Sequence, residues 1–325
     1  MRTPRYLYLT ITRECNLRCQ QCHFWAYKDP PDRLSIEELK GVIDQFCELN
    51  PEGIVVFSGA ETTVRKEEFF ELSRYVSSKG MIATCVTNGY DFDEASCERM
   101  ILEGPRFITV SLDSHIPEVH NRLRGKKDVF ERAVKTIKRL VKYRDKYPFK
   151  RAGITVIAII YNENIESLFD YIEFVRSFGV NGVLFQILSP TFARVGEEDK
   201  FFKNHFFRDK ERAKDLLDRL YRRYRDDPFV NLKRDDIEWF KAYIDNPEFL
   251  TEPFCDSHNK NIFIELTGDV VLCAHMRNLN NGRSIGNIRT QRLVDILKSD
   301  EADRMRTIME RCRKNCGLLA CHRKE

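Results

Sequence analysis

Residues 5–22 read RYLYLTITRECNLRCQQC, a run of aromatic and β-branched residues followed at once by three cysteines in eight positions. The first eight residues predict a β-strand. Cys15, Cys19 and Cys22 would then lie in the loop at its carboxyl end, where rigid scaffolds gather functional side chains. Three thiols are one short of a structural zinc site, which takes four nitrogen or sulfur ligands. The alternative is a [4Fe–4S] cluster with one iron lacking a cysteine, and the spacing favours it over a zinc site completed by His23.

Beyond this stretch, short β-rich runs alternate with amphipathic helical runs as far as residue 190. We predict strands at 5–12, 53–59, 81–89, 106–113, 151–161 and 182–190, and helices at 35–49, 65–80, 93–104, 129–144 and 165–179. Such alternation is typical of parallel βα units. Six units indicate an α/β fold built as a partial (βα)6 TIM-like barrel, with functional residues where strands end and loops begin.

The rest of the chain changes in composition and indicates two further parts. Residues 197–250 are highly charged and helical, and we interpret them as a bridging region after a barrel that spans residues 1–196. Residues 251–325 predict a small α+β domain, with two strands around a turn at Thr267–Asp269 and a final helix over 292–312.

The charge balance and hydropathy pattern exclude several classes of protein. The 325 residues include 54 basic and 50 acidic ones, which leaves a net charge of +4 with the two signs interspersed. Such a surface makes no general case for nucleic-acid binding. The sequence has no signal-peptide core and no uninterrupted run of 18 apolar residues, so we predict a cytoplasmic protein without a membrane partner.

Eleven cysteines in a reducing compartment indicate metal binding or catalysis rather than disulfides. Three lie at the front of the chain, and five lie near its end, namely Cys255, Cys273, Cys312, Cys316 and Cys321. The other three, Cys47, Cys85 and Cys97, fall within predicted helices or strands and are expected to be small buried hydrophobes. Two clusters predict two separate sites.

The first cluster, in its context, resembles the signature of the radical S-adenosylmethionine (SAM) enzymes, in which three cysteines spaced by three and two residues follow the first strand of a partial barrel. In that family the open iron binds the amino and carboxylate groups of SAM, and one-electron reduction releases a 5′-deoxyadenosyl radical that abstracts hydrogen from the substrate. The resemblance implies that Cys15, Cys19 and Cys22 hold a [4Fe–4S] cluster. It also implies a reducing partner such as flavodoxin or ferredoxin.

Other strand ends extend this resemblance. The family's Gly-Gly-Glu-Pro after the second strand corresponds here to Gly59-Ala60-Glu61-Thr62, and SLDSHIPEVHNRLRG, residues 111–125, resembles members with cluster-bearing C-terminal extensions. The resemblance implies contacts to SAM or substrate from Glu61, Asn88, Ser111, Asp113, Arg124, Asn164 and Gln186. A turn or cap is the alternative role for such polar strand-end residues. Gln21 replaces the family's usual aromatic residue or histidine, so an amide, His23 or Phe24 would act near the adenine.

The C-terminal cysteines resemble the SPASM and twitch extensions of radical SAM enzymes, in which cysteines flank a β-hairpin and others follow a helix. Cys255 and Cys273 bracket the hairpin glycine Gly268. The resemblance implies one auxiliary [4Fe–4S] cluster, with the expected ligands Cys255, Cys273, Cys316 and Cys321. Cys312 is an alternative ligand, the remnant of a second cluster, or a thiol that returns a hydrogen atom to a product radical. A structural zinc at four thiolates is also chemically sound.

These resemblances imply a radical SAM oxidoreductase or lyase that uses two [4Fe–4S] clusters to oxidise, dehydrate or epimerise a small polar metabolite. A peptide maturase of the SPASM type is the alternative, but the first strand begins near residue 5 and leaves no room ahead of it for a leader-binding module. An electron-transfer protein without SAM chemistry and an RNA-modifying enzyme are further alternatives, although the basic face expected of the latter is not evident. We expect residues 190–250, rich in Phe and Arg, to cover the substrate, contact a partner, or simply pack as helices.

Overall fold

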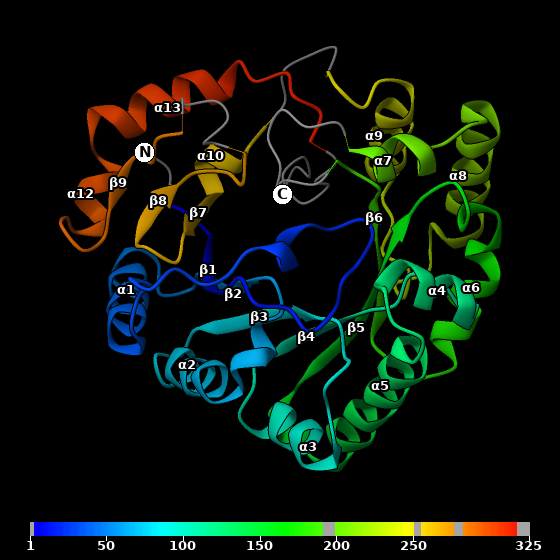
Figure 1. Cartoon of the computed structure of the whole chain (residues 1–325), viewed down its shortest axis with the longest axis horizontal. Helices are drawn as coiled ribbons and strands as arrows, with labels where there is room; N and C mark the ends of the chain where they lie inside the picture. The colour runs from blue at the N-terminus through cyan, green and yellow to red at the C-terminus, as the bar shows by residue number, and fades with distance from the viewer. Residues whose placement is uncertain (1–2, 191–198, 250–254, 276–281, 317–325) are drawn as a thin grey trace.

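The computed structural model describes residues 3–190, 199–249, 255–275 and 282–316. Six parallel strands form a curved sheet in the order β6-β5-β4-β3-β2-β1 (Figure 1). They are β1 (Tyr6–Thr12), β2 (Ile54–Gly59), β3 (Ile82–Thr87), β4 (Phe107–Ser111), β5 (Gly153–Ile160) and β6 (Gly182–Ile187). Each strand pairs in parallel with its neighbour in sequence, which confirms the predicted partial barrel.

Helices cover the outer face of this sheet, as the alternation predicts (Figure 1). They are α1 (Ile36–Leu49), α2 (Lys66–Ser78), α3 (Glu94–Leu102), α5 (Val129–Lys146) and α6 (Leu168–Arg176). Alternate residues of β1, such as Leu7 and Leu9, are fully buried in the core between the two layers, as are Cys85 and Cys97, while Cys47 packs against that core. None of the described helices is both long and apolar enough to cross a membrane.

Helix α4 (Pro117–Arg124), which is absent from the predicted set, follows β4. Its sequence does carry boundary residues: Pro117 lies in the first turn, where its missing N–H needs no partner, and Gly125 ends the helix with a φ of 77°. A Cβ at Gly125 would lie 2.4 Å from the carbonyl oxygen of Arg18, so this glycine also lets α4 approach the cysteine loop. The helix thereby carries Arg124 to the carboxyl ends of the strands.

The charged segment between residues 199 and 249 is helical and covers the edge of the barrel at β6. Its helices are α7 (Lys200–His205), α8 (Lys210–Tyr224) and α9 (Arg234–Asp245). Between α8 and α9, the carbonyl oxygen of Phe229 accepts a hydrogen bond from Val183 N at 2.8 Å. This contact satisfies a backbone group of an edge strand that would otherwise be open to pairing with another chain.

The C-terminal part continues the barrel sheet instead of forming a sheet of its own. Strand β7 (Asn261–Ile264) pairs in parallel with β1, and β8 (Asp269–Val271) and β9 (Gly286–Asn287) follow as antiparallel neighbours. The predicted turn between β7 and β8 is present, and Gly268 adopts a φ of 89° there. Nine strands therefore form one sheet. The C-terminal part also contains the helices α10 (Ser257–Lys260), α12 (Leu293–Leu297) and α13 (Asp300–Glu310).

The single helix predicted over 292–312 is wrong, because the segment holds two helices, α12 and α13. After α12 ends, the Oγ of Ser299 accepts a hydrogen bond from Ala302 N at 3.2 Å. A serine in this position caps the start of a new helix. The chain therefore turns within residues 292–312, although no glycine or proline there signals a break.

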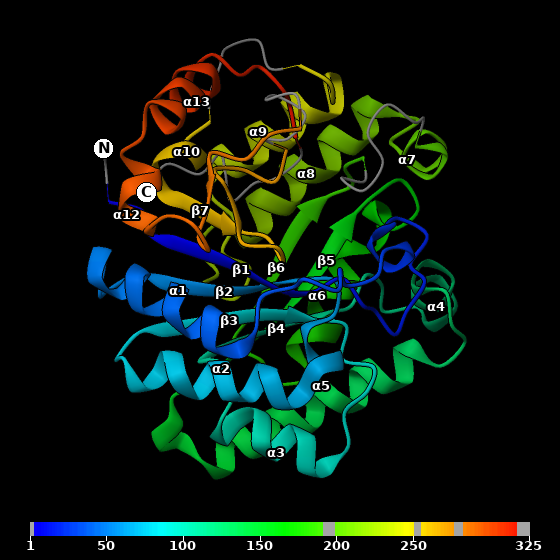
Figure 2. The same ribbon diagram turned by 60° about the vertical axis from the view of Figure 1, so that its left-hand side comes forward.

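Contacts beyond the pairing of β7 with β1 fasten the C-terminal part to the barrel. Leu34 N donates to the carbonyl oxygen of Leu266 at 2.7 Å. Arg289 forms an ion pair with Glu38 of α1, with an N–O distance of 2.6 Å. Helix α12 lies against α1 (Figure 2). The first barrel helix is thus shared between the barrel and its C-terminal extension.

Candidate active site

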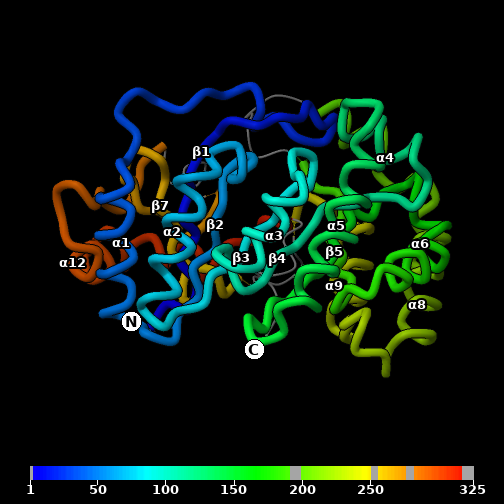
Figure 3. Tube along the Cα trace, turned by 90° about the horizontal axis from the view of Figure 1, so that it is seen from below, coloured from blue at the N-terminus to red at the C-terminus, as the bar shows by residue number. Residues whose placement is uncertain are grey.

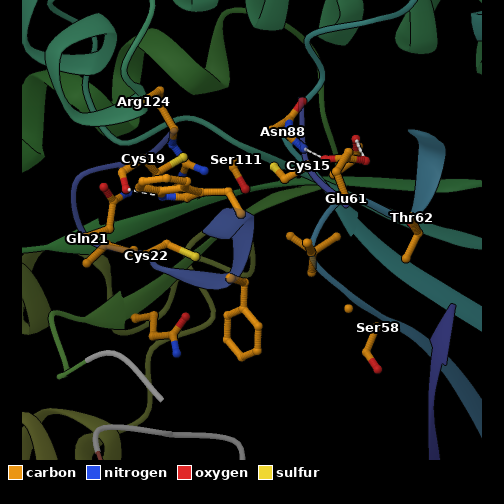
Figure 4. A pocket seen from close by; sticks show the side chains of 18 of the residues that line it. Cys15, Cys19, Gln21, Cys22, Ser58, Glu61, Thr62, Asn88, Ser111 and Arg124 are labelled. Carbon is orange, nitrogen blue, oxygen red and sulfur yellow. Dashed lines mark hydrogen bonds between the residues drawn. The ribbon is translucent and has the colours of Figure 1, made fainter. Parts of the chain in front are cut away.

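A cavity of about 430 Å³ lies at the carboxyl ends of the barrel strands (Figure 4). Its walls include eight residues that the sequence singles out, namely Cys15, Cys19, Cys22, Glu61, Asn88, Ser111, Arg124 and Gln186. These residues come from the loop after β1, from the ends of other strands and from α4. The fold therefore brings widely separated positions of the barrel sequence onto one cavity.

The three thiols of the cysteine loop, residues 13–34, are largely buried beside one another. Cys19 is 8% exposed, and burial raises its pKa to about 12. Burial likewise raises the pKa of Cys15 and of Cys22. A negative charge on either of these two would raise the pKa of Cys19 further, whereas the positive charge of Arg124 lowers it. Buried thiolates in this arrangement need additional positive charge, which a bound iron–sulfur core would supply.

The donors that line the cavity fit an iron–sulfur cluster with one open iron. The sulfur ligands of one tetrahedral zinc ion lie about 3.8 Å apart, because each Zn–S bond is about 2.3 Å long. Within the described chain, no three His, Cys, Asp or Glu side chains are placed to hold one metal ion. Thiolates of a [4Fe–4S] cluster bind different irons and can stand farther apart. The described cavity lining contains no fourth cysteine and no histidine, so one iron would lack a side-chain ligand.

Glu61, almost fully buried after β2, ties neighbouring strand ends together. Its Oε1 accepts hydrogen bonds from Thr63 Oγ1 at 2.6 Å and Thr87 Oγ1 at 2.8 Å, and its Oε2 accepts one from Asn88 N at 2.7 Å. Burial raises the pKa of this carboxyl group, although these donors act in the opposite direction. Because Oε2 accepts only one hydrogen bond from the described residues, it keeps capacity for a donor in the cavity.

Arg124 pairs with the buried carboxylate of Asp113, which follows β4. Arg124 Nε donates to Asp113 Oδ2 at 2.7 Å, and Asp113 N donates to His120 Nδ1 at 3.1 Å. Burial opposes ionisation of Asp113, but the charge of Arg124, neighbouring His120 and the hydrogen bonds to the carboxylate together outweigh it and hold the Asp113 pKa below its usual range. A fixed cation therefore stands at the wall of the cavity, close enough to Cys19 to lower its pKa.

The C-terminal cysteines lie on separate segments. Cys255 precedes α10, Cys273 follows β8, and Cys312 follows α13. Burial raises the pKa of Cys255, and negative charge on Cys312 raises it further. Cys312 is therefore near enough to a cysteine of the predicted auxiliary site to act on its charge. Cys321, predicted as a ligand of the same site, lies outside the described residues.

The segment 312–316 is held against the end of α9. Asn315 N donates to the carbonyl oxygen of Glu248 at 3.0 Å. Burial lowers the pKa of His275 to about 3, and the charge of Lys314 acts in the same direction. The segment that carries Cys316 is thus positioned between the end of the bridging helices and the residues that follow β8.

Two family profiles match this chain in the same order as its two cysteine regions. The profile described as the radical SAM superfamily matches residues 9–175. The chain belongs to the radical SAM superfamily. The profile described as an iron–sulfur cluster-binding domain, SPASM, matches residues 255–321. Both resemblances found in the sequence are thereby confirmed, and they imply [4Fe–4S] clusters and SAM as the cofactors of this radical SAM protein.

Curated relatives of this radical SAM chain differ in how much of it they cover. The AdoMet-dependent heme synthase of Oleidesulfovibrio alaskensis is 28% identical over 185 residues, which are 56% of this chain and 45% of that protein. The chain spans about half the length of the heme synthases it matches. The tungsten-containing aldehyde ferredoxin oxidoreductase cofactor-modifying protein of Pyrococcus furiosus is 23% identical over 308 residues, 91% of this chain and 81% of that one.

Among solved structures, SuiB of Streptococcus suis shares the fold of this radical SAM chain. Its structure bound to S-adenosylmethionine superposes with a TM-score of 0.70 at 13% identity, covering 96% of this chain and 73% of SuiB. SuiB is also known bound to the precursor peptide SuiA, with the same TM-score. At this level of identity, the likeness shows the fold alone.

Two of the predicted SAM contacts lie outside the cavity lining. Asp113 is buried behind Arg124, and Asn164 Nδ2 donates to the Asp113 carbonyl oxygen at 2.9 Å. Asp113 therefore holds Arg124 in place, and Asn164 holds Asp113, but neither side chain lines the cavity. Cys312, predicted among other roles as a hydrogen donor, is also absent from the described lining. Its place beside Cys255 suits a metal ligand instead.

Asn88 lines the cavity, but its side chain is engaged in holding the cysteine loop. Its Nδ2 donates to Asn16 Oδ1 at 2.8 Å, and its Oδ1 accepts from Tyr90 N at 2.9 Å. The predicted contact to SAM would require Asn88 to share these partners. Ser111 and Gln186 line the same cavity, and both remain predicted contacts.

The sequence did not reveal Asp29, which anchors the cysteine loop at its far end. Asp29 Oδ2 accepts hydrogen bonds from Thr12 Oγ1 and Arg65 Nε, both at 2.9 Å. These bonds close the loop against β1 and the short 3-10 helix η2 (Thr62–Arg65). A lone aspartate before Pro30 carries only the pattern of a turn, so no motif marked this role.

Two polar atoms at the cavity wall have no hydrogen-bond partner within the described chain. Thr62 is 2% exposed and its Oγ1 is unsatisfied, as is the buried Oε1 of Gln21. Both residues line the cavity, and buried polar atoms are normally satisfied by protein, water or ligand. These two departures from the family pattern therefore offer hydrogen-bonding groups to whatever fills the cavity.

Proposed function

We propose that this chain reductively cleaves SAM and directs the resulting radical to a hydrogen atom of a small polar metabolite. The observation that carries the proposal is the grouping of three buried thiols, without a fourth cysteine in the described lining, on a cavity at the carboxyl ends of the strands. Such a donor set leaves a coordination position for a cofactor, as the open site of a catalytic metal centre does.

Each lining residue then has a distinct role. Cys15, Cys19 and Cys22 would hold the cluster, which together with SAM supplies the one-electron cleavage and the 5′-deoxyadenosyl radical. Arg124 presents a fixed positive charge that suits the carboxylate of SAM. The free capacity of Glu61 Oε2 suits its amino group. The networks behind these groups fix their positions before the ligand arrives, which is the condition for accurate orientation.

The character of the cavity wall supports a small polar substrate. In this proposal the cavity of about 430 Å³ also holds the cluster and SAM, so its wall and not its volume bears on the substrate. Beyond the thiols its wall is formed by Trp25, Gln186 and Ser189 among others. A few polar groups on a mainly apolar wall are typical of sites that orient a compact polar ligand.

A peptide substrate is the second candidate, because SuiB, which shares this fold, binds the precursor peptide SuiA. The two candidates differ in how much of the substrate must lie outside the cavity. Incubating the reduced chain with SAM and either the low-mass polar fraction or the peptide fraction of a cell extract separates them. The metabolite proposal predicts that only the low-mass fraction stimulates 5′-deoxyadenosine formation, and stimulation confined to the peptide fraction would contradict it.

The auxiliary cluster belongs, in this proposal, to Cys255, Cys273 and Cys312, with Cys316 or Cys321 completing the set. The proximity of Cys312 to Cys255 supports this assignment. The sheet connects this region to the cavity, because Tyr8 of β1 lines the cavity and stacks on Phe263 of β7 with ring centroids 4.3 Å apart. Strand β7, which belongs to the C-terminal part, thus lies next to the strand that carries Tyr8 into the cavity wall.

The decisive experiment uses the full chain reconstituted anaerobically with iron and sulfide. The proposal predicts about eight irons per chain and formation of 5′-deoxyadenosine when dithionite and SAM are added together. Omitting either SAM or dithionite is the control and should abolish the product. Clusters that form without any 5′-deoxyadenosine would instead identify an electron-transfer protein, and zinc in place of iron at the C-terminal cysteines would remove the auxiliary cluster.

A further inference from the structure

A group of basic side chains lies on the outer side of the cysteine loop. It consists of Arg18 from the loop together with Arg122, Lys126 and Lys127 from α4 and the turn after it, and we call it the basic patch. Arg18, Arg122 and Lys127 are exposed. Figures 2 and 3 show the dark blue cysteine loop lying against α4. Two elements that are distant in sequence therefore contribute to one surface.

The basic patch is separated from the three thiols by little more than the loop backbone. Arg18 Nη1 donates to the carbonyl oxygens of Cys15 and Leu17, both at 2.9 Å. Gln20 N donates to the carbonyl oxygen of Leu123 at 2.8 Å, which fixes the loop to α4. An object resting on this patch would thus lie against the loop that carries the three thiols.

The charges of the basic patch are not neutralised locally. None of its four residues forms an ion pair with a described carboxylate, and the nearest one in sequence, Asp128, is bound by Arg132 at 2.5 Å. Lys126 lies over the ring of Tyr90, 4.2 Å from its centroid, which also leaves its charge uncompensated. The whole chain carries a net charge of only +4, so this local excess of positive charge is a distinct feature of the surface.

We propose that the basic patch is the docking surface for a small acidic electron-carrier protein of the flavodoxin or ferredoxin class. This inference rests on the proposed function, in which the carrier loses one electron and the C5′–S bond of SAM accepts it and breaks to methionine and the 5′-deoxyadenosyl radical. Opposite charges accelerate such encounters by about 10- to 1,000-fold. Electron transfer also slows steeply with distance, and docking behind the loop places the carrier next to the thiols.

The test compares a charge-reversed patch with a matched control. Lys126→Glu/Lys127→Glu reverses two charges of the basic patch, and Lys135→Glu/Lys138→Glu makes the same change farther along α5; none of the four residues lines the cavity. Reconstituted holoprotein is assayed for 5′-deoxyadenosine with flavodoxin and its reductase, with reduced ferredoxin, and with dithionite. Binding of each oxidised carrier to the holoprotein is measured separately by calorimetry.

At low ionic strength, the patch variant should lose about tenfold or more of the carrier-driven rate and of the carrier affinity. The dithionite-driven rate of the patch variant should stay close to that of the unaltered chain. The control variant should keep its rates and its carrier affinity. Added salt should slow the unaltered chain with the carrier and leave its dithionite rate unchanged, because screening acts on the docking step.

Three outcomes would overturn the docking proposal. The first is that the patch variant loses the same fraction of its rate with the carrier as with dithionite. The second is that the patch variant binds the carrier as tightly as the unaltered chain does. The third is that the unaltered chain cleaves SAM with dithionite but with neither flavodoxin nor ferredoxin. In each of these cases the proposed function itself stands, because SAM is still cleaved with dithionite. If the unaltered chain cleaves no SAM even with dithionite, the proposed function fails, and the docking proposal fails with it.

Discussion

The two cysteine regions of this chain are built in opposite ways. Residues 15–22 supply three thiols from one loop, which Asp29 anchors at its far end. The C-terminal region draws Cys255, Cys273 and Cys312 from three separate segments, and the charge of Cys312 acts on Cys255 although 56 residues lie between them in the sequence. The first site is therefore encoded locally, whereas the second depends on tertiary structure. This difference predicts that the two sites can be damaged independently.

The largest effects are expected from removing single thiols. Cys15→Ala should lower the iron content by about four irons per chain and reduce SAM cleavage to background, because a cubane cluster needs each of its ligands. Cys312→Ala should remove a similar amount of iron but leave dithionite-driven cleavage of SAM in place. Iron analysis and quantification of 5′-deoxyadenosine measure both effects.

Cys47→Ala is the matched control for both thiol variants, since Cys47 lies in α1 and packs against the core. It should keep the full iron content and activity. If Cys312→Ala retained all of its iron, our reassignment of this thiol to the auxiliary site would be wrong. If it abolished SAM cleavage with dithionite, the two regions would not be independent.

A second test addresses the buried charges behind the first site. Arg124→Gln leaves the carboxylate of Asp113 buried without its partner, 2.7 Å away in the unaltered chain, and should lower the free energy of unfolding by about 3–5 kcal/mol. Arg124→Lys should lose less, because it keeps the charge. Urea unfolding measures both, and exposed Arg122→Gln should change stability by less than about 0.5 kcal/mol. A loss below about 1 kcal/mol for Arg124→Gln would show that the pair contributes little.

The features of the fold and the site that could be predicted from sequence are those that contiguous residues encode. The features that depend on tertiary contacts could not be predicted. The strands and helices of the barrel were predicted because each has a long periodic pattern, and the three-cysteine loop was found because its spacing is contiguous. Helix α4 was missed, since it has only eight residues, most of them polar, and only Pro117 and Gly125 mark its ends. The break at Ser299 was missed because no glycine or proline interrupts residues 292–312.

The sequence could not predict which strand-end residues line the cavity and which are buried behind its wall. The motif places Asp113 and Asn164 near the cofactor, but side-chain direction after a strand end depends on partners such as Arg124 and the backbone of β5. Likewise, the sequence favours Cys316 and Cys321 over Cys312 because Cys312 ends the predicted helix. The structure ends α13 at Glu310 and places Cys312 near enough to Cys255 to act on its charge, while Cys321 lies outside the described residues.

An effect of intermediate size is expected in the pH dependence of stability. It tests His120, which is buried behind the first site next to Asp113. Burial lowers the pKa of His120 to about 3, whereas an unfolded histidine has a pKa of about 6.5. The unfolded state therefore binds a proton below pH 6.5 that the folded state does not bind, so this contribution is complete above pH 6.5 and is lost as the pH falls toward 3. Between pH 7.5 and 5 the loss should be about 2 kcal/mol.

The matched variant for this pH effect is His120→Gln, which removes the titrating group while offering an acceptor to Asp113 N. Urea unfolding at several pH values measures the slope for both chains. Subtracting one slope from the other isolates His120, because all other histidines titrate in both. Parallel stability profiles for the two chains would show that His120 is not the titrating group.

A smaller effect is expected at Thr62, whose Oγ1 has no partner in the described chain. Thr62→Val should weaken SAM binding by roughly two- to tenfold, as expected for one hydrogen bond of about 0.5–1.5 kcal/mol, with little loss of stability. Thr63→Val is the contrasting variant, because Thr63 Oγ1 donates to Glu61 at 2.6 Å and its loss should destabilise the fold. Equilibrium dialysis with SAM and urea unfolding measure the two effects. Unchanged SAM affinity in Thr62→Val would remove this residue from the binding site.

The smallest effect concerns the attachment of the second region to the first. Arg289 and Glu38 form a 2.6 Å ion pair between the C-terminal part and α1, with side chains 33% and 35% exposed. Arg289→Gln should therefore cost no more than about 1 kcal/mol, as for other pairs open to solvent. Arg292→Gln, which breaks a more exposed pair with Glu48, should cost less still. Thermal unfolding of the holoprotein measures both, and a loss of several kcal/mol for Arg289→Gln would mean that the second region is held by this contact more than by the pairing of β7 with β1.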